Sequence, residues 1–232
     1  IVLTGPPGEL RGFLKISNKN AEPLRVKSLG VSSSEKQGAL SASASMPLRF
    51  SFRLQPGEEK IGDIAHQLPL HTPPGTYESS VVVGGATRKL KIIVQALIDI
   101  DIYPTNFSFL GASPGKKHTA TFTLTNLGNM PFQVPEVKHA TTLDMDFLCR
   151  AVSLAIRNKG QEGYTPMMDE LTKSIHNDMS GWVSIAIKET GNIIAPGETA
   201  MLTLDITLPN DMDAKKDYAG NIRFWDKEIT YV

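Results

Sequence analysis

The sequence predicts a mainly β protein built from two tandem β-sandwiches, the second of which is interrupted by a helical-hairpin insertion. Three observations support this fold class. Two sequence patterns of turns and strands, called phrases below, recur in the same order. Short segments of alternating polar and apolar residues fill most of the chain, and in one segment the apolar residues recur at helical spacing instead. We expect the first sandwich to cover residues 1–96 and the second to cover residues 97–232, with the insert at about residues 141–180.

The internal repeat is the strongest of these signals. Its first phrase is a Pro-Gly turn and a strand that ends in Asn, and its second is Pro-Gly-Glu followed by a strand, a Pro and a Tyr. The first phrase occurs at Pro7, Gly8 and Asn18 and again at Pro114, Gly115 and Asn126, with 108 positions between the two Asn residues. The second phrase begins at Pro56 and again 140 positions later at Pro196. The offsets 140 and 108 differ by 32, which places about 32 extra residues between the phrases of the second copy.

Strands are expected directly after the turns of each copy. Pro and Gly suit the second and third positions of a tight turn, because Pro presets φ and Gly adopts a positive φ at little cost. In residues 118–126 the side chains of Ala120, Phe122 and Leu124 share one face and four Thr share the other, which is typical of a half-buried strand. Residues 98–102 alternate Ile with Asp, so we expect a strand and a short, stiff junction between the copies.

Each copy is expected to close with a hairpin. Tyr77 and Tyr218 begin the penultimate strands, where a Tyr either hydrogen-bonds back to the backbone, as in a tyrosine corner, or packs at the strand edge. The closing hairpins are expected to turn at Gly84-Gly85 and at Asp226-Lys227. Short strands with regular turns everywhere outside the insert favour two sandwiches.

This pattern resembles a broad group of bacterial and archaeal extracytoplasmic immunoglobulin-like (Ig-like) domains. The matching residues are Pro56, Gly57, Glu58, Pro69, Pro74, Gly75, Thr76 and Tyr77 in the first copy and Pro196, Gly197, Glu198, Pro209 and Tyr218 in the second. The resemblance covers nearly the whole chain except the insert, and the second copy departs from it where KDYAG replaces Gly-Thr-Tyr. It implies two tandem Ig-like β-sandwiches in a periplasmic, secreted or cell-surface protein, forming a structural or binding module without catalytic residues.

The insert begins with a predicted helix in residues 141–160. Its apolar residues recur at helical spacing, and Thr142 or Asp144 is the expected N-cap. Gly160 is the expected stop, because Gly readily adopts the left-handed conformation that ends many helices.

A second helix is predicted in residues 164–179. Thr165 is its expected N-cap, and Pro166 suits the first helical position. An apolar stripe follows at spacings of three, four and four, formed by Met168, Leu171, Ile175 and Met179. Either this stripe packs on the second sandwich, or a flexible partner surface stays exposed, formed by Met167, Met168, Leu171 and Met179.

Composition argues against several functional classes. The 24 Lys and Arg balance the 24 Asp and Glu, so the chain lacks the positive charge typical of proteins that bind nucleic acid. Cys149 is the only cysteine, which rules out an intrachain disulfide, and no apolar stretch is long enough to span a membrane. We interpret Trp182 and Trp225 as core residues in preference to a platform for sugars.

No catalytic, cofactor-binding or metal site is expected, and no cofactor. The five histidines lack the spacing of metal ligands. The carboxylates near the insert are explained by the charges of helix ends more simply than by a bound cation; they are Asp144, Asp146, Asp169, Glu170 and Asp178, near His176.

The sequence therefore favours a non-enzymatic, extracytoplasmic structural or protein-interaction module. Its partner is expected to be a protein that binds the helical insert or a free sheet edge. A periplasmic assembly chaperone is one alternative, because residues 103–134 are similar to the first domain of pilus chaperones, although here they lie in the second copy. An accessory carbohydrate-binding domain of a glycan-active enzyme is another. We expect the chain to be a piece of a longer surface or secreted product.

Overall fold

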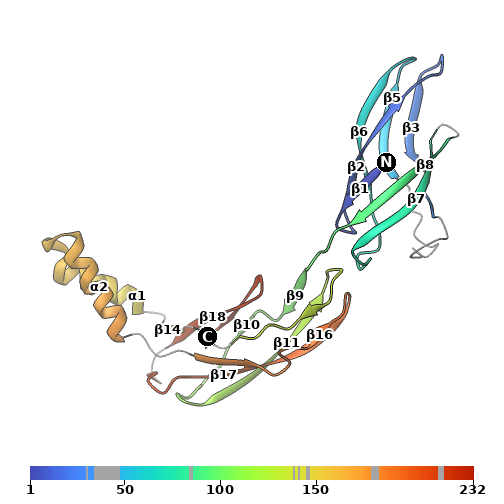
Figure 1. Ribbon diagram of the computed structural model, residues 1–232. Coiled ribbons are helices and arrows are strands. Elements are labelled where there is room, and N and C mark those ends of the chain that lie inside the picture. The colour runs from blue at the N-terminus through green and yellow to red at the C-terminus, as the bar shows by residue number, and fades with distance from the viewer. Residues whose placement is uncertain are drawn as a thin grey trace. The chain divides into compact units, whose positions relative to one another are not determined.

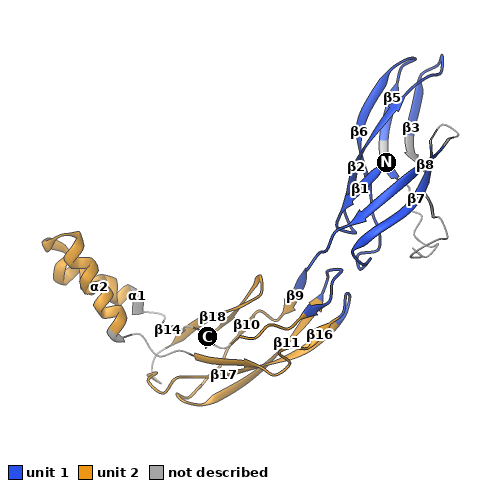
Figure 2. Cartoon of the chain, viewed as in Figure 1, with its two compact units in different colours: residues 1–100, 126–132, 195–198 blue, residues 101–125, 133–194, 199–232 orange. Residues whose placement is uncertain are grey.

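A computed structural model describes residues 1–29, 31–33, 48–83, 86–137, 139–140, 142–144, 147–178, 183–213 and 217–232. Strands make up 49% of the protein and helices 15%, so the predicted mainly β class with one helical hairpin is confirmed. The chain forms two compact units (Figure 2): unit 1 comprises residues 1–100, 126–132 and 195–198, and unit 2 comprises residues 101–125, 133–194 and 199–232. Two loops of the second sequence copy therefore belong to unit 1, and the expected limits 1–96 and 97–232 stay a prediction.

The described strands of unit 1 form one hydrogen-bonded sheet of eight strands (Figure 1). They are β1 (Val2–Gly5), β2 (Leu10–Ser17), β3 (Leu24–Leu29), β4 (Val31–Ser33), β5 (Leu48–Leu54), β6 (Glu59–His66), β7 (Gly75–Val83) and β8 (Ala86–Val94), in the order β3-β5-β6-β2-β1-β8-β7-β4. Strand β1 joins the two halves of the sheet, because it pairs antiparallel with β2 on one side and parallel with β8 on the other.

The sheet of unit 1 folds back on itself around an apolar core. Strands β3 and β7 are far apart in the sheet order, yet they contact each other. Both halves of the sheet contribute buried side chains, including Leu3, Leu14, Phe52, Ile64 and Ile92. Complete burial of a side chain of this kind contributes about 1.5–3 kcal/mol, so the apolar core is the main source of stability of this unit.

The described residues of unit 2 form two main sheets and one short strand pair. Its strands are β9 (Ile100–Tyr103), β10 (Asn106–Phe107), β11 (Lys117–Asn126), β12 (Phe132–Gln133), β13 (His139–Ala140), β14 (Thr142–Asp144), β15 (Val183–Ile187), β16 (Ile193–Ile194), β17 (Thr199–Thr207), β18 (Tyr218–Phe224) and β19 (Lys227–Tyr231). The first residue of β9, Ile100, is also the last residue of the segment 1–100 of unit 1. The sheet orders are β13-β15-β17-β11-β9, β10-β19-β18-β14 and β12-β16. The rings of Phe122 and Phe224, one from each main sheet, meet edge to face with 5.7 Å between centroids, so the two sheets share a core.

The two sequence copies pair corresponding strands in the same register. In the first copy β2 pairs with β6, and Leu14 lies opposite Gly62. In the second copy β11 pairs with β17, and Phe122 lies opposite Leu202. Phe122 follows Leu14 by 108 positions and Leu202 follows Gly62 by 140, the same two offsets that the sequence phrases have. The strand register therefore confirms the predicted correspondence of the two copies.

The Asn that ends each repeated strand makes the same set of hydrogen bonds in both copies. Asn18 and Asn126 are both fully buried, and an amide side chain can donate and accept at once. In the first copy the side chain of Asn18 bonds to Glu22 O and Asn20 N, and its backbone bonds to Glu58 O and Gly57 N. In the second copy the side chain of Asn126 bonds to Met130 O and Gly128 N, and its backbone bonds to Glu198 O and Gly197 N. The recurring Asn and Pro-Gly-Glu signals thus have one structural cause.

The helical insert consists of α1 (Phe147–Lys159), a 3-10 turn η1 (Gly160–Glu162) and α2 (Tyr164–Asp178). The α-helix ends at Lys159, so the expected end before Gly160 is confirmed, but the expected left-handed glycine is wrong: Gly160 begins η1, and Gly163 after it has the positive φ, 110°. Pro166 is the third helical residue of α2. Its missing N–H costs no hydrogen bond, because N–H groups in the first turn of a helix have no partner within the helix. Within the described residues, no helix combines the length and apolar character needed to cross a membrane.

The expected N-caps of both helices are wrong. Thr142 and Asp144 lie in β14, opposite Gly220 and Tyr218 of β18, because strand pairing with a distant segment outweighs a local capping preference. Thr165 lies inside the first turn of α2, one residue after the helix begins.

Candidate functional site

A loop of the second copy is hydrogen-bonded inside unit 1 through Asn129, which is 2% exposed. Its Nδ2 donates to Thr72 O and to Gln95 O, each at 3.0 Å, and its Oδ1 accepts from Leu97 N at 2.7 Å. Asn129 therefore makes three of the four hydrogen bonds that an amide side chain can form. These bonds join the loop at residues 126–132 to two other segments of unit 1.

The backbone of the same loop approaches residues 97–99 closely. Gly128 N donates to Asp99 O at 3.0 Å, and Asn129 N donates to Leu97 O at 3.0 Å. A Cβ on Gly128 would lie only 2.3 Å from Leu97 O, so glycine is required at this position. No signal in the sequence points to these contacts, because the partners lie about 30 positions away in the chain.

His71 completes this group of contacts. Its Nδ1 donates to Gly128 O at 2.9 Å, because the carbonyl oxygen can only accept. Gly197 has a φ of 79°, and a Cβ there would lie 2.9 Å from His71 Nε2. We call this group the Asn129 cluster, formed by His71, Thr72, Gln95, Leu97, Gly128, Asn129 and Gly197.

The partner surface predicted on the insert is half-buried. Met167, Met168 and Leu171 are neither fully buried nor fully exposed on α2, and Met179 lies outside the described residues. Ala151 and Ala155, one turn apart on α1, are buried, and α1 packs against α2. Small side chains allow two helices to approach closely. The role of the Met167, Met168 and Leu171 side chains in binding a partner stays a prediction.

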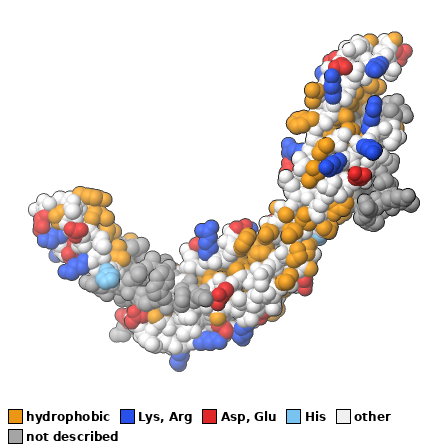
Figure 3. Space-filling view, in the orientation of Figure 1, with side chains coloured by type: hydrophobic (Ala, Val, Ile, Leu, Met, Phe, Trp, Pro, Cys, Tyr) orange, Lys and Arg blue, Asp and Glu red, His pale blue; other side chains and the backbone are white. Residues whose placement is uncertain are grey.

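Larger apolar side chains are exposed on α1. Val152, Leu154 and Ile156 are between 41% and 55% exposed, and Figure 3 shows hydrophobic side chains gathered along one edge of the hairpin. The buried face of this helix is formed by Ala151 and Ala155 instead. The repeat of Val152 and Ile156 at a spacing of four residues is the sequence signal for this second apolar face.

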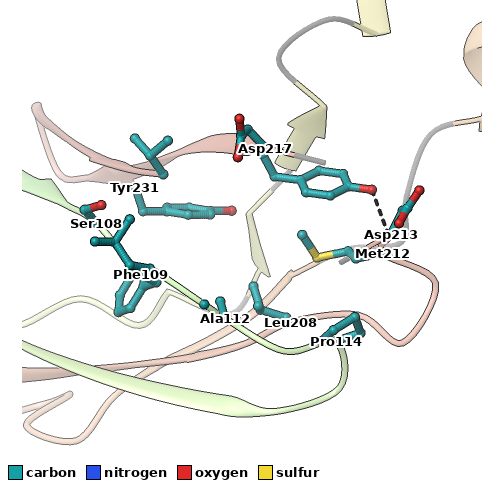
Figure 4. Close-up of a pocket in the computed structure, with 13 residues that line it drawn as sticks. Ser108, Phe109, Ala112, Pro114, Leu208, Met212, Asp213, Asp217 and Tyr231 are labelled. Carbon is teal, nitrogen blue, oxygen red and sulfur yellow. Dashed lines mark hydrogen bonds between the residues drawn. The ribbon is translucent and has the colours of Figure 1, made fainter. Parts of the chain in front are cut away.

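Unit 2 contains a cavity of about 200 Å³ beside the end of β19 (Figure 4). Phe109, Leu208 and Met212 provide apolar walls, and Tyr218 and Tyr231 bring aromatic rings and hydroxyl groups to it. Pockets for drug-sized ligands usually measure about 300–1,000 Å³, so this cavity suits one or two side chains better than a cofactor. Sequence analysis did not find it, because its walls come from residues 108–114 and residues 208–232, segments about 100 positions apart.

Both predicted tyrosines hydrogen-bond back to the backbone. The Tyr77 hydroxyl donates to Pro73 O at 2.7 Å. The Tyr218 hydroxyl accepts from Asp213 N at 3.0 Å. Of the two alternatives for these residues, the bond typical of a tyrosine corner is confirmed.

Trp225 does not lie in the core. It is 50% exposed and occupies the turn between β18 and β19 with a φ of 57°. The core interpretation of Trp225 is therefore wrong, and the second closing turn lies at Trp225-Asp226, one residue earlier than expected. Trp182 and the Gly84-Gly85 turn lie outside the described residues.

Ionisable groups in the described part of the chain do not assemble into a metal site. No group of three or more His, Cys, Asp or Glu residues there could hold a metal ion, and the candidate Asp146 lies outside that part. Cys149 is exposed on α1.

Two buried ionisable groups have shifted pKa values. Lys117 Nζ lies 2.6 Å from Asp205 Oδ2, and Thr119 Oγ1 donates to Asp205 Oδ1 at 2.7 Å. The ammonium of Lys117 and then the hydroxyl of Thr119 lower the pKa of the Asp205 carboxyl. His66 is buried in unit 1, its Nδ1 has no partner among the described protein atoms, and burial lowers its pKa.

The sequence matches no known family model, and no curated protein matches it. Solved structures show low similarity. The CupB2 chaperone of Pseudomonas aeruginosa is 11% identical over 99% of this chain and 94% of its own, with a TM-score of 0.24. Domains 4 and 5 of the S-layer protein SbsC are 11% identical over 89% of this chain and 97% of their own, with a TM-score of 0.30. The I9–I11 tandem of titin is 14% identical over 99% of this chain and 60% of its own, with a TM-score of 0.23. These likenesses amount to a weak resemblance to β-rich domains.

Proposed function

We propose that this chain is a non-enzymatic structural and protein-interaction module made of two tandem Ig-like β-sandwiches, located in the periplasm, in a secreted protein or on a cell surface. The observation that carries the proposal is the Asn129 cluster. Through it, segments from both sequence copies are hydrogen-bonded within one compact unit. A structural module needs bonds of this kind between segments that are distant in the chain, because loops without such bonds open locally.

Strand pairing supports the Ig-like part of the proposal. In each unit an early short strand pairs parallel with the last strand, β1 with β8 and β10 with β19. The last two strands of each unit form an antiparallel hairpin, β7 with β8 and β18 with β19. Together with two tyrosine-corner bonds, this arrangement is typical of Ig-like sandwiches of about 100 residues.

Limited proteolysis tests the structural part. We expect residues 95–99 and 126–132 of the native chain to resist cleavage, because the bonds of the cluster hold these segments inside unit 1. Asn129→Ala should make both segments cleavable, because these bonds are lost. Rapid cleavage of both segments in the native chain would refute a structural role for the cluster.

The interaction part rests on the exposed apolar side chains of α1. A tagged chain, cross-linked in its source cells, is expected to recover a stoichiometric protein partner. The double variant Val152→Lys/Ile156→Lys should lose that partner, because charges replace its apolar contact. Ser153→Lys is the matched control, since Ser153 is exposed on the same helix without being apolar. Equal recovery by both variants would exclude this face as the contact.

A carbohydrate-binding accessory domain is the second candidate, favoured by the exposed indole of Trp225 on a hairpin turn. Aromatic rings presented in this way are suited to stacking on sugar faces. A glycan array tests it directly, with Trp225→Ala as the control. The absence of any bound glycan would remove this candidate and leave the first untouched.

A further inference from the structure

The helical hairpin of unit 2 leaves apolar side chains uncovered on both of its helices. On α1, Ala151 and Ala155 are buried. Val152 and Ile156 share another side of this helix and are 41% and 55% exposed. Figure 3 shows hydrophobic side chains along one edge of the hairpin and charged side chains toward the other. One hairpin therefore does not cover its own apolar residues, and on α2 four of them are only half-buried: Met167, Met168, Leu171 and Ile175.

The two helices carry opposite net charges. Helix α1 contains three basic residues and no acidic residue, which gives a charge of +3; they are Arg150, Arg157 and Lys159. Helix α2 contains three acidic residues against one lysine, which gives −2 with its histidine neutral; they are Asp169, Glu170, Asp178 and Lys173. Each helix therefore attracts a helix of the other kind and repels a helix of its own kind.

These charges make the hairpin complementary to itself. A twofold axis between two identical copies brings the same surface of each copy into the contact. If α1 of one copy lay against α1 of the other, +3 would face +3; if α1 lay against α2 of the other copy, +3 would face −2 in two symmetric places. The second arrangement closes a four-helix bundle, in which neighbouring helix axes are about 8–10 Å apart and apolar side chains fill the centre. A second hairpin of this chain therefore fits both the apolar surface and the charges.

We propose that the hairpin binds the hairpin of a second copy of this chain, with α1 of each copy against α2 of the other. The proposal rests on the proposed interaction function and identifies the partner as a second copy. The two helices have 13 and 15 residues, so each one offers a partner helix of nearly its own length. The burial of Val152 and Ile156 supplies the affinity, and the charges decide which helices pair, because exposed ion pairs by themselves add little affinity.

Sedimentation equilibrium tests whether two copies associate. We expect a monomer–dimer equilibrium, and a native chain that stays monomeric up to about 100 μM would overturn the proposal. Val152→Lys/Ile156→Lys should weaken the dimer about 100-fold or more, because charges replace the apolar contact, and circular dichroism should still show native helical content, because both side chains are exposed. Ser153→Lys, exposed on the same helix, is the matched control and should change dimerisation less than about threefold. Equal dimerisation of the two variants would also overturn the proposal.

Two charge reversals test which helices pair. Arg157 on α1 and Lys173 on α2 are both exposed, and replacing either with Glu changes the net charge of the chain equally. Arg157→Glu makes α1 less positive and should weaken the dimer about threefold or more, whereas Lys173→Glu makes α2 more negative and should strengthen it by about the same factor. The reverse pair of results would mean that like helices face each other, and two equal results would mean that the helices do not meet; either result would overturn the proposal.

Hydrogen exchange of the native chain locates the contact without any substitution. Raising the protein concentration should slow exchange in residues 147–159 and 164–178, and slowing confined to other segments would overturn the proposal. In its source cells a tagged chain should recover the untagged chain. A monomeric chain whose Val152→Lys/Ile156→Lys variant loses a different protein would overturn the second-copy proposal and leave the proposed interaction function standing. Limited proteolysis at the Asn129 cluster tests the structural part of that function separately.

Discussion

Replacing Asn129 with Ala should weaken unit 1 at one identifiable place. The substitution removes three side-chain hydrogen bonds and leaves Leu97 N, Thr72 O and Gln95 O without this partner. A hydrogen bond contributes about 0.5–1.5 kcal/mol net, and a buried polar group left unpaired costs about 1–3 kcal/mol. Because water can reach part of the opened loop, we expect a total loss of about 2–4 kcal/mol in the free energy of unfolding.

Equilibrium urea unfolding gives the size of this loss, and hydrogen exchange followed by mass spectrometry gives its place. Exchange should accelerate first in peptides that cover residues 95–99 and 126–132. Ala21→Asn is the matched control, since Ala21 follows Asn18 by three residues, as Asn129 follows Asn126, but is exposed. The control should change stability by less than about 0.5 kcal/mol. A change this small for Asn129→Ala, with unaltered exchange at Leu97, would refute the assigned role of the cluster.

Three further outcomes follow from single side chains. Phe122→Ala should cost about 3–5 kcal/mol in thermal unfolding of unit 2, because the ring is 1% exposed; a loss below about 1 kcal/mol would place it outside the core. Burial lowers the pKa of His66 below its ordinary 6.5, so the unfolded chain binds the proton first as the pH falls, and stability should decrease below about pH 6.5. His66→Leu should flatten this slope in urea titrations at several pH values, and identical slopes would contradict the assignment. Gly197→Ala should lower the free energy of unfolding more than Gly57→Ala, because both glycines have positive φ but only a Cβ at position 197 would press against His71. Equal decreases in the free energy of unfolding would show that the imidazole moves aside freely.

Signals that depend on neighbouring residues allowed much of the fold to be predicted. Pro-Gly turns, alternating strands and the Asn that ends each repeated strand act within a few residues, as the bonds from Asn18 to Asn20 and Glu22 illustrate. The two sequence offsets recur in the observed strand register, because the pairs Leu14–Gly62 and Phe122–Leu202 keep them, although the sequence did not predict which strands pair.

Features that depend on distant segments could not be predicted in the same way. Asp144 satisfies the local chemistry of a helix cap, but its pairing with Tyr218 lies 74 positions away in the chain. Asn129 bonds to Thr72, 57 positions away, and no short pattern announces that contact. The residue of the first copy that corresponds to Asn129 is Ala21, which cannot form the same side-chain hydrogen bonds. Comparison of the two copies therefore gives no hint of the role of Asn129.

The cavity shows a third kind of limit. Its walls join residues 108–114 to residues 208–232, so no single stretch of the sequence contains it. The repeat in the sequence identified corresponding strands but not how far each one extends.

Unit 1 is completed by residues that the ribosome makes long after its strands. Strand β8 ends at Val94, yet the segments 126–132 and 195–198 belong to the same unit. At about 5–20 residues per second, roughly 100 residues of synthesis take about 5–20 s. During that interval the carbonyl groups of Thr72 and Gln95 are still hydrogen-bonded to water, because Asn129 has not yet been synthesised. A translational pause before residue 126 would therefore lengthen the time for which unit 1 is incomplete.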